Sequence, residues 1–150
     1  MAPGKTRESD GGDAALRLGN QLCFPLYAAS RKVVRLYTPL LEPLGLTYTQ
    51  YITLLALWEQ DGLAIKDLGQ LLYLDSGTLT PLLKKLEQQG LIRRNRSGLD
   101  ERVVTVHLTE AGHALKQRAM AIPGQVASCL PLKLTDAVLL KSLLERILEP

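Results

Sequence analysis

The sequence has little cysteine and few aromatic residues, and it contains no long apolar run. Its two cysteines, Cys23 and Cys129, lie far apart and form no C-x-x-C pair, which argues against a zinc site and a disulfide-rich fold. No apolar stretch approaches the roughly 20 residues that span a membrane, and the N-terminus lacks the apolar core of a secretory signal. We therefore expect a cytoplasmic protein without a membrane partner, a metal or a cofactor, in a compartment that disfavours permanent disulfides.

The net charge of +3 is too small to indicate a nucleic-acid partner by itself, but the charges are unevenly distributed. Between Lys84 and Arg102 the chain carries six basic and three acidic residues. A local basic excess is typical of a surface that binds phosphate, although a basic stretch alone is also compatible with an ordinary solvated face. Which of the two applies therefore depends on where this stretch lies in the fold.

Composition and periodicity predict one domain at residues 13–150 after a flexible polar tail at residues 1–12. Apolar residues at spacings of three and four predict helices at about 13–46, interrupted by Pro39 and Pro43, and again at about 109–150. One of the latter begins after Thr109 and runs to about Ile122, and the last spans about 135–148.

The segment at about 47–108 has a different organisation. Thr47 and Gln50 form a capping-box pattern at a helix start, and Asp75 and Gly90 bracket a later helix. Alternation then predicts strands at 91–96 and 102–108 around a turn. Helix, turn, helix and basic hairpin, in that order, predict a mainly α protein with a winged helix-turn-helix.

A helix of this kind fits the major groove, its first residues can reach base edges, and its lysines can reach phosphate. The arginines of the hairpin can reach the adjacent minor groove or the phosphate backbone. We therefore expect double-stranded operator DNA as the partner. The expected contacts are Ser76, Thr78, Thr80, Lys84, Lys85, Arg94, Arg96, Asp100 and Arg102.

The outer helices carry more leucine than the small central unit can cover. A two-fold homodimer would bury these stripes and place two reading helices about 34 Å apart, on a pseudo-palindromic site. The alternative is that both helices pack on the central unit of their own chain.

Several motifs resemble the MarR family of bacterial repressors, and within it the organic hydroperoxide resistance repressors. The resemblance rests on Tyr73–Leu86, Asp100–Arg102, Leu108–Gly112, Asn20–Phe24 with Tyr27, and Leu46–Tyr51 with Leu57–Glu59. It implies that Cys23 is the peroxide-reactive thiol, that Tyr37 and Tyr48 of the partner subunit bond to its sulfur, and that Tyr27 lies nearby. It also implies that Asp100 and Arg102 shape the wing, and that Cys129 resolves oxidised Cys23 as an intersubunit disulfide.

The reactive species toward a hydroperoxide is the thiolate. Pro25 suits the first turn of a helix, which would put Cys23 near the positive end of the helix dipole; a helix that starts near Asp13 would instead be kinked at Pro25. Cys23 and Tyr37 are 14 residues apart in sequence, or about 21 Å along a helix, so their pairing requires a partner chain.

Three other functions remain open at this point. A MarR-type repressor released by a non-covalent ligand, such as a phenolic compound, would respond independently of its thiols. A thiol peroxidase would turn over repeatedly with a reductant, although the reading helix and hairpin argue against an enzyme. An activator would share the same DNA-binding features.

Overall fold

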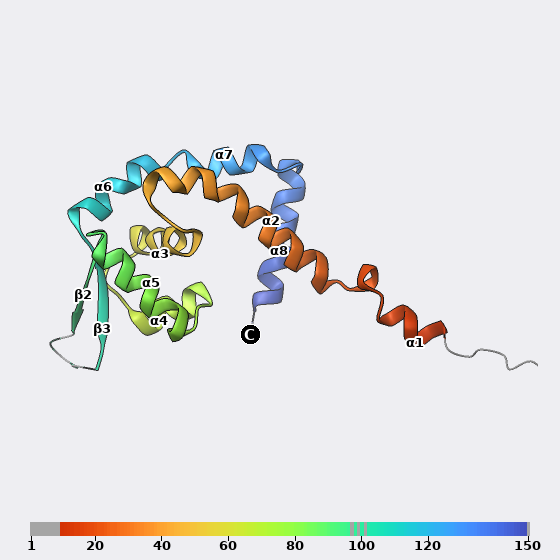
Figure 1. The fold of residues 1–150 in the computed structure, drawn as a ribbon, viewed down its shortest axis with the longest axis horizontal. Helices are drawn as coiled ribbons and strands as arrows, with labels where there is room; N and C mark the ends of the chain where they lie inside the picture. The colour runs from red at the N-terminus through yellow and green to blue at the C-terminus, as the bar shows by residue number, and fades with distance from the viewer. Residues whose placement is uncertain (1–9, 97, 99, 101, 150) are drawn as a thin grey trace, which may run out of the picture.

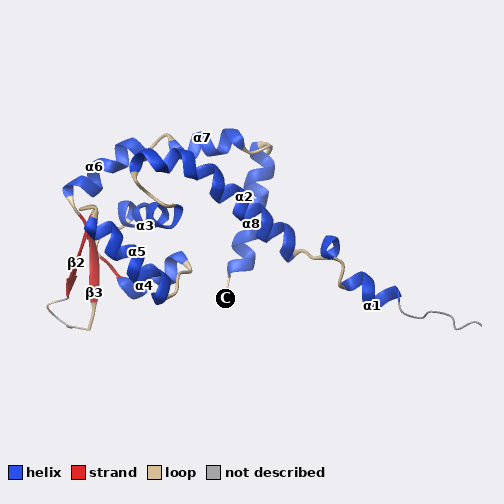
Figure 2. Cartoon of the chain, viewed as in Figure 1, coloured by secondary structure: helices blue, strands red, loops and turns tan. Residues whose placement is uncertain are grey.

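The structure is a computed structural model that describes residues 10–96, 98, 100 and 102–149, and it is mainly helical with one small sheet (Figures 1 and 2). The α-helices are α1 (Asp10–Ala15), α2 (Cys23–Leu41), α3 (Tyr48–Glu59), α4 (Ile65–Leu72), α5 (Ser76–Gln88), α6 (Glu110–Ala119), α7 (Ile122–Cys129) and α8 (Leu134–Leu148). Single 3-10 turns are η1 (Leu18–Asn20) and η2 (Glu42–Leu44), and the strands are β1 (Leu63–Ala64), β2 (Ile92–Arg96) and β3 (Val104–Leu108).

Helices α3 to α5 and the sheet form a region that we call the winged lobe (residues 47–109). Its buried side chains belong to a core that also includes Leu41, Leu115 and Ile122. The strands pair antiparallel in the order β1-β3-β2, with Val106 opposite both Leu63 and Arg94. Apolar side chains from each element meet inside, and Leu54, Leu68, Leu83 and Leu86 are fully buried there. The expected winged helix-turn-helix is confirmed.

The helix starts in this lobe are set by local side-chain bonds, as the sequence predicts. The Thr47 hydroxyl accepts the N–H of Gln50, and the Gln50 side chain accepts the N–H of Thr47, which completes a capping box. Asp75 caps α5 and Thr109 caps α6 in the same manner. Gly90 has a φ of +72°, a conformation that favours glycine, and it ends the α5 segment as expected.

The start of helix α2 distinguishes between the two alternatives for Pro25, in the first turn of a helix or at a kink within a longer one. It begins at Cys23, and η1 separates it from α1, so a helix continuous from Asp13 is wrong. The expected interruption at Pro39 is also wrong, because Pro39 lies inside α2, which continues to Leu41. Proline removes one helical hydrogen bond, and the adjoining turns retain theirs. The chain turns only at η2, which contains Pro43.

The ends of the chain differ from the predictions in two places. Most of the expected tail, residues 1–9, lies outside the described residues, and α1 already begins at Asp10 and extends away from the rest of the molecule (Figure 1). The predicted helix from Thr109 to Ile122 ends at Ala119, and a separate helix, α7, follows. Pro123 lies in the first turn of α7, where its missing N–H is harmless.

Outside the winged lobe, α2 and α7 run side by side, and α8 then crosses near the start of α2 (Figure 1). Ile122 and Val126 of α7 are buried, whereas none of the residues of α8, all of which are described, is buried. Among the described residues, no helix is both long and apolar enough to cross a membrane.

Candidate functional site

Both cysteines lie at helix ends. Cys23 is the first residue of α2 and Cys129 is the last residue of α7. Both side chains are exposed, and neither thiol is joined in a disulfide. The first residues of a helix have backbone N–H groups without an intrahelical partner, and Cys23 lies at such a helix start. Of the two alternatives for Pro25, the structure therefore has the one in which Pro25 lies in the first turn of a helix that begins at Cys23.

Three tyrosines gather where α2 meets α3. The ring centroids of Tyr37 and Tyr48 are 4.9 Å apart, and those of Tyr37 and Tyr51 are 5.7 Å apart. Burial raises the pKa of Tyr37, and burial followed by the charge of Tyr37 raises the pKa of Tyr48. Both phenols therefore stay protonated and remain O–H donors. Tyr51 is fully buried behind them; its apolar spacing predicted a core position but not its place in this cluster.

The cluster and the thiol occupy separate parts of α2. Because α2 is helical from Cys23 to Leu41, Cys23 and Tyr37 are separated by about 21 Å of helix. The fold therefore brings Tyr37 and Tyr48 together but leaves Cys23 away from both within one chain. This agrees with the separation that the sequence predicts.

Tyr27 lies one turn after Cys23 and away from the cluster. Its side chain is 57% exposed. Arg31 donates a hydrogen bond of 2.5 Å to the Tyr27 hydroxyl, and its guanidinium carbon lies 5.4 Å from the centre of the Tyr27 ring. Arg31 was not among the residues that the sequence singled out, although it continues the i, i+4 spacing from Cys23 through Tyr27.

The outer face of α5 is polar and exposed, and the opposite face is the lobe core. Of the predicted DNA contacts on this helix, Ser76, Thr78, Thr80, Lys84 and Lys85 are all exposed. The Thr78 hydroxyl donates to the carboxylate of Asp75, and the Thr78 backbone N–H does the same. These bonds lower the pKa of Asp75, the backbone bond most. The start of α5 is thereby fixed in position.

The hairpin β2–β3 presents Arg96 and Arg102 outward, since both are exposed. At the wing tip the Asp100 carboxylate accepts the backbone N–H of Arg102 at 2.9 Å. Residues 97, 99 and 101 of the expected turn lie outside the described residues.

Arg94 differs from the other predicted DNA contacts. Its Nε and Nη2 atoms donate to Glu87 Oε2 at 3.0 and 2.6 Å, and its backbone N–H donates to Glu87 Oε1. These bonds lower the pKa of Glu87. The guanidinium of Arg94 thereby joins β2 to α5, and a contact of Arg94 with DNA stays a prediction.

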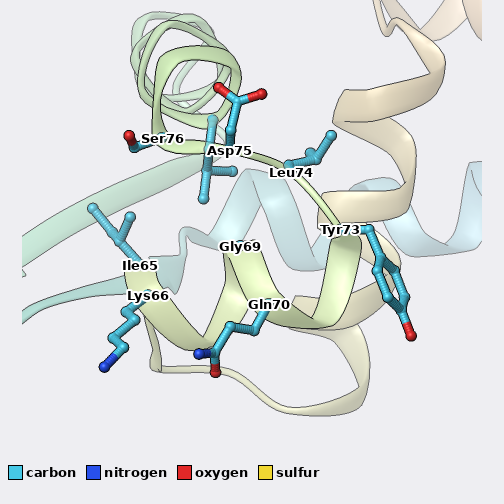
Figure 3. A pocket seen from close by; sticks show the side chains of 9 residues that line it. Ile65, Lys66, Gly69, Gln70, Tyr73, Leu74, Asp75 and Ser76 are labelled. Atoms are coloured by element: carbon cyan, nitrogen blue, oxygen red, sulfur yellow. The ribbon is translucent and has the colours of Figure 1, made fainter. Parts of the chain in front are cut away.

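Sequence reasoning overlooked a groove of about 550 Å³ between α4 and the start of α5 (Figure 3). Lys66 and Gln70 line it from α4, and Asp75 and Ser76 line it from the other side. Tyr73 ends α4 with a φ of +54° and is exposed. The available signal was the i, i+4 spacing of Lys66 and Gln70, which places two polar side chains on one face beside the reading helix.

Comparison with known proteins assigns the family. Residues 35–119 match the family described as "Transcriptional regulator SarA/Rot". The chain is 52% identical over 134 residues to the "Organic hydroperoxide resistance transcriptional regulator" of Bacillus subtilis (strain 168), which covers 89% of this chain and 91% of that relative. The chain belongs to the MarR family of transcriptional regulators. The resemblance predicted from the cysteine, tyrosine and wing motifs is confirmed.

Solved structures agree with this assignment. The reduced form of AbfR bound to DNA, from Staphylococcus epidermidis, is 38% identical, covers 91% of this chain and 93% of its own, and superposes with a TM-score of 0.76. The disulfide form of AbfR is 37% identical, covers 95% and 100%, and superposes with a TM-score of 0.62. The chain thus superposes better on the reduced, DNA-bound form of this relative than on its disulfide form.

Proposed function

We propose that this protein is a homodimeric repressor that binds operator DNA when reduced and is released when an organic hydroperoxide oxidises Cys23. The observation that carries the proposal is the division of one redox site between two ends of α2: the exposed thiol at its start and the paired phenols of Tyr37 and Tyr48 near its end. A partner chain running antiparallel would complete the site. The names of the relatives support this reading, since they include a hydroperoxide resistance regulator and a regulator with reduced and disulfide forms.

Exposed apolar surface supports the proposed dimer. Helix α8 exposes leucine and isoleucine along its length, including Leu139, Leu143 and Ile147, and the start of α2 exposes Leu22 and Phe24. A contiguous apolar surface of this kind is typical of a protein interface rather than of a monomer surface. A two-fold interface through these helices would set the spacing of the two α5 helices.

DNA binding uses the outward face of the winged lobe. The polar start of α5 would lie in the major groove, Lys84 and Lys85 would contact phosphate, and Arg96 and Arg102 would flank the helix from the wing. Lys66 and Gln70, in the groove beside α5, are positioned to add contacts to the DNA backbone.

The switch is a thiol reaction. The Cys23 thiolate attacks the hydroperoxide, an S–O bond forms, the O–O bond breaks, and the leaving alkoxide takes up a proton to give an alcohol. The Cys129 thiol of the partner then displaces water from the sulfenic acid to give a disulfide. A disulfide requires the two Cα atoms to lie within about 7 Å, so its formation draws Cys23 away from the tyrosines and alters the spacing of the reading helices.

The test is a fluorescence anisotropy titration of operator DNA with the reduced protein, before and after stoichiometric cumene hydroperoxide, together with a non-reducing denaturing gel. We expect loss of DNA binding in the wild type, retention in Cys23→Ser, and a dimer-sized band that Cys129→Ser abolishes. Release of DNA from Cys23→Ser by hydroperoxide would contradict the proposal. Response of that variant to a phenolic ligand alone would instead favour non-covalent release.

A further inference from the structure

The contact between Tyr27 and Arg31 lies on the surface and joins the two side chains in two ways. Arg31 is the donor in the 2.5 Å bond, and its guanidinium also lies 5.4 Å from the ring centre of the same tyrosine. Since Arg31 donates, the phenolic proton of Tyr27 is not used in this bond and can be donated elsewhere. A hydroxyl that accepts a bond from a cation is also a stronger donor.

The spacing along α2 places Tyr27 and Arg31 on the same helix face as the Cys23 thiol. Cys23, Tyr27 and Arg31 follow one another at i, i+4 and i+8, so they share one face of the helix. Side chains on a helix lean toward its N-terminus, so Arg31 reaches over the turn of Tyr27, as observed, and Tyr27 leans over the turn of Cys23. The phenol and the reactive thiol therefore lie on the same face of α2, one turn apart.

The surface beside this pair is open and cationic. A groove of about 510 Å³ is lined by Tyr27, Arg31, Lys32 and Arg35, together with Ala28 and Leu36. A small molecule can therefore approach Tyr27 from solvent, and an anion formed there would meet positive charge.

We infer that Arg31 is a positioning residue for the reaction of Cys23: it holds Tyr27 as the proton donor to the oxygen that leaves when Cys23 reduces an organic hydroperoxide. This inference rests on the proposed function. When the Cys23 sulfur bonds to the terminal oxygen and the O–O bond breaks, the electron pair of that bond passes to the leaving alkoxide. Tyr27 transfers its proton to that alkoxide, the phenolate is stabilised by the Arg31 guanidinium, and water later reprotonates it.

The experiment compares two reactions of Cys23 in the full-length protein carrying Cys129→Ser. Cys23 is then the single cysteine, so the measured rates belong to it alone. Oxidation by cumene hydroperoxide releases an alkoxide that needs a proton, whereas alkylation by iodoacetamide releases iodide, which does not. We expect Arg31→Gln to slow oxidation by at least about tenfold, within the range of general acid catalysis, and to change alkylation by less than about twofold. Arg31→Lys, which keeps a charge and a donor, is expected to restore part of the oxidation rate.

A double-mutant cycle separates positioning from a merely structural effect. If Arg31 acts through Tyr27, then Tyr27→Phe, Arg31→Gln and the double variant will slow oxidation to the same extent. Lys116→Gln, which removes an exposed cation of α6 that does not line this groove, is the matched control and is expected to leave the rate unchanged. Equal DNA affinity of all reduced variants will show that each is folded.

The outcomes discriminate between this inference and the function on which it rests. Additive effects of Tyr27→Phe and Arg31→Gln, an equal slowing of alkylation, or an unchanged oxidation rate would each overturn the role of Arg31. Failure of the wild-type Cys23 to react with hydroperoxide would overturn the proposed function itself.

Discussion

The winged lobe and helix α8 use leucine in opposite ways. In the lobe, Leu68, Leu83 and Leu86 are completely buried, and the core closes within one chain. In α8, Leu139 and Ile147 are each 60% exposed, and no residue of the helix is buried. The same residue type at the same helical spacing therefore builds a finished core in one region and an open apolar face in the other. The leucines of the lobe are therefore covered within the single chain, whereas the apolar face of α8 is left open in it.

The largest effect is expected from charge on the apolar face of α8. The double variant Leu139→Glu, Leu143→Glu should convert the dimer to a monomer and weaken operator binding by at least about 100-fold, because binding of the second half-site is then no longer intramolecular. Sedimentation velocity and anisotropy measure the two effects. Lys141→Gln, on the same helix but at a polar, 78% exposed side chain, is the control that should preserve the dimer. A dimer that survives the double variant would show that the apolar face of α8 does not form the interface.

Alanine substitutions in the lobe core and on α8 should lower stability in different ways. Leu83→Ala should reduce the free energy of unfolding by about 2–5 kcal/mol, because it leaves a cavity in the closed lobe. Leu143→Ala, on α8, should act mainly through the dimer, so its effect on the melting temperature should depend on protein concentration. Thermal unfolding at several concentrations measures both. A concentration-dependent shift for Leu83→Ala alone would contradict the division.

A smaller effect is expected within the lobe, at the bond between the wing and α5. Glu87→Gln removes the charge that accepts from Arg94 and should weaken DNA binding a few-fold, corresponding to at most about 1 kcal/mol. Because Arg94 lowers the pKa of Glu87, the stabilisation is present above the ordinary value of 4.5 and is lost as the pH falls through the lowered pKa. Unfolding by urea between pH 3 and 7 should therefore show a steeper loss in the wild type than in Glu87→Gln.

The smallest effect is expected at the tyrosine cluster, between the lobe and α2. Burial raises the pKa of Tyr48 above 10.0, so its contribution to stability is complete below that pH and is lost as the pH rises through the raised pKa. Tyr48→Phe should therefore lose less stability than the wild type between pH 9 and 11. Urea unfolding at both pH values measures the difference, and identical losses in the two proteins would show that Tyr48 is not shielded by the fold.

Much of the lobe could be predicted from the sequence because its signals are local. Thr47, Asp75 and Thr109 cap their helices through bonds to residues three positions away, and such bonds can be recognised in the sequence. The change from helical to alternating periodicity after Gly90 likewise marks the wing. The thiol of Cys23 and its separation from Tyr37 also followed from sequence spacing, because helix geometry is fixed.

The tertiary structure alone decided what depends on distant residues. Pro39 remains inside α2, and Pro123 opens a separate helix, although the same residue type was expected to end a helix in both places. Arg94 is bound to Glu87, which the count of basic residues cannot reveal, and Arg31 orients Tyr27. Tyr51 packs behind Tyr37 because α2 and α3 meet there. Local sequence patterns are therefore enough to predict the helices, the wing and the reactive side chains. Contacts between distant residues, such as that of Arg94 with Glu87, depend on how these elements pack.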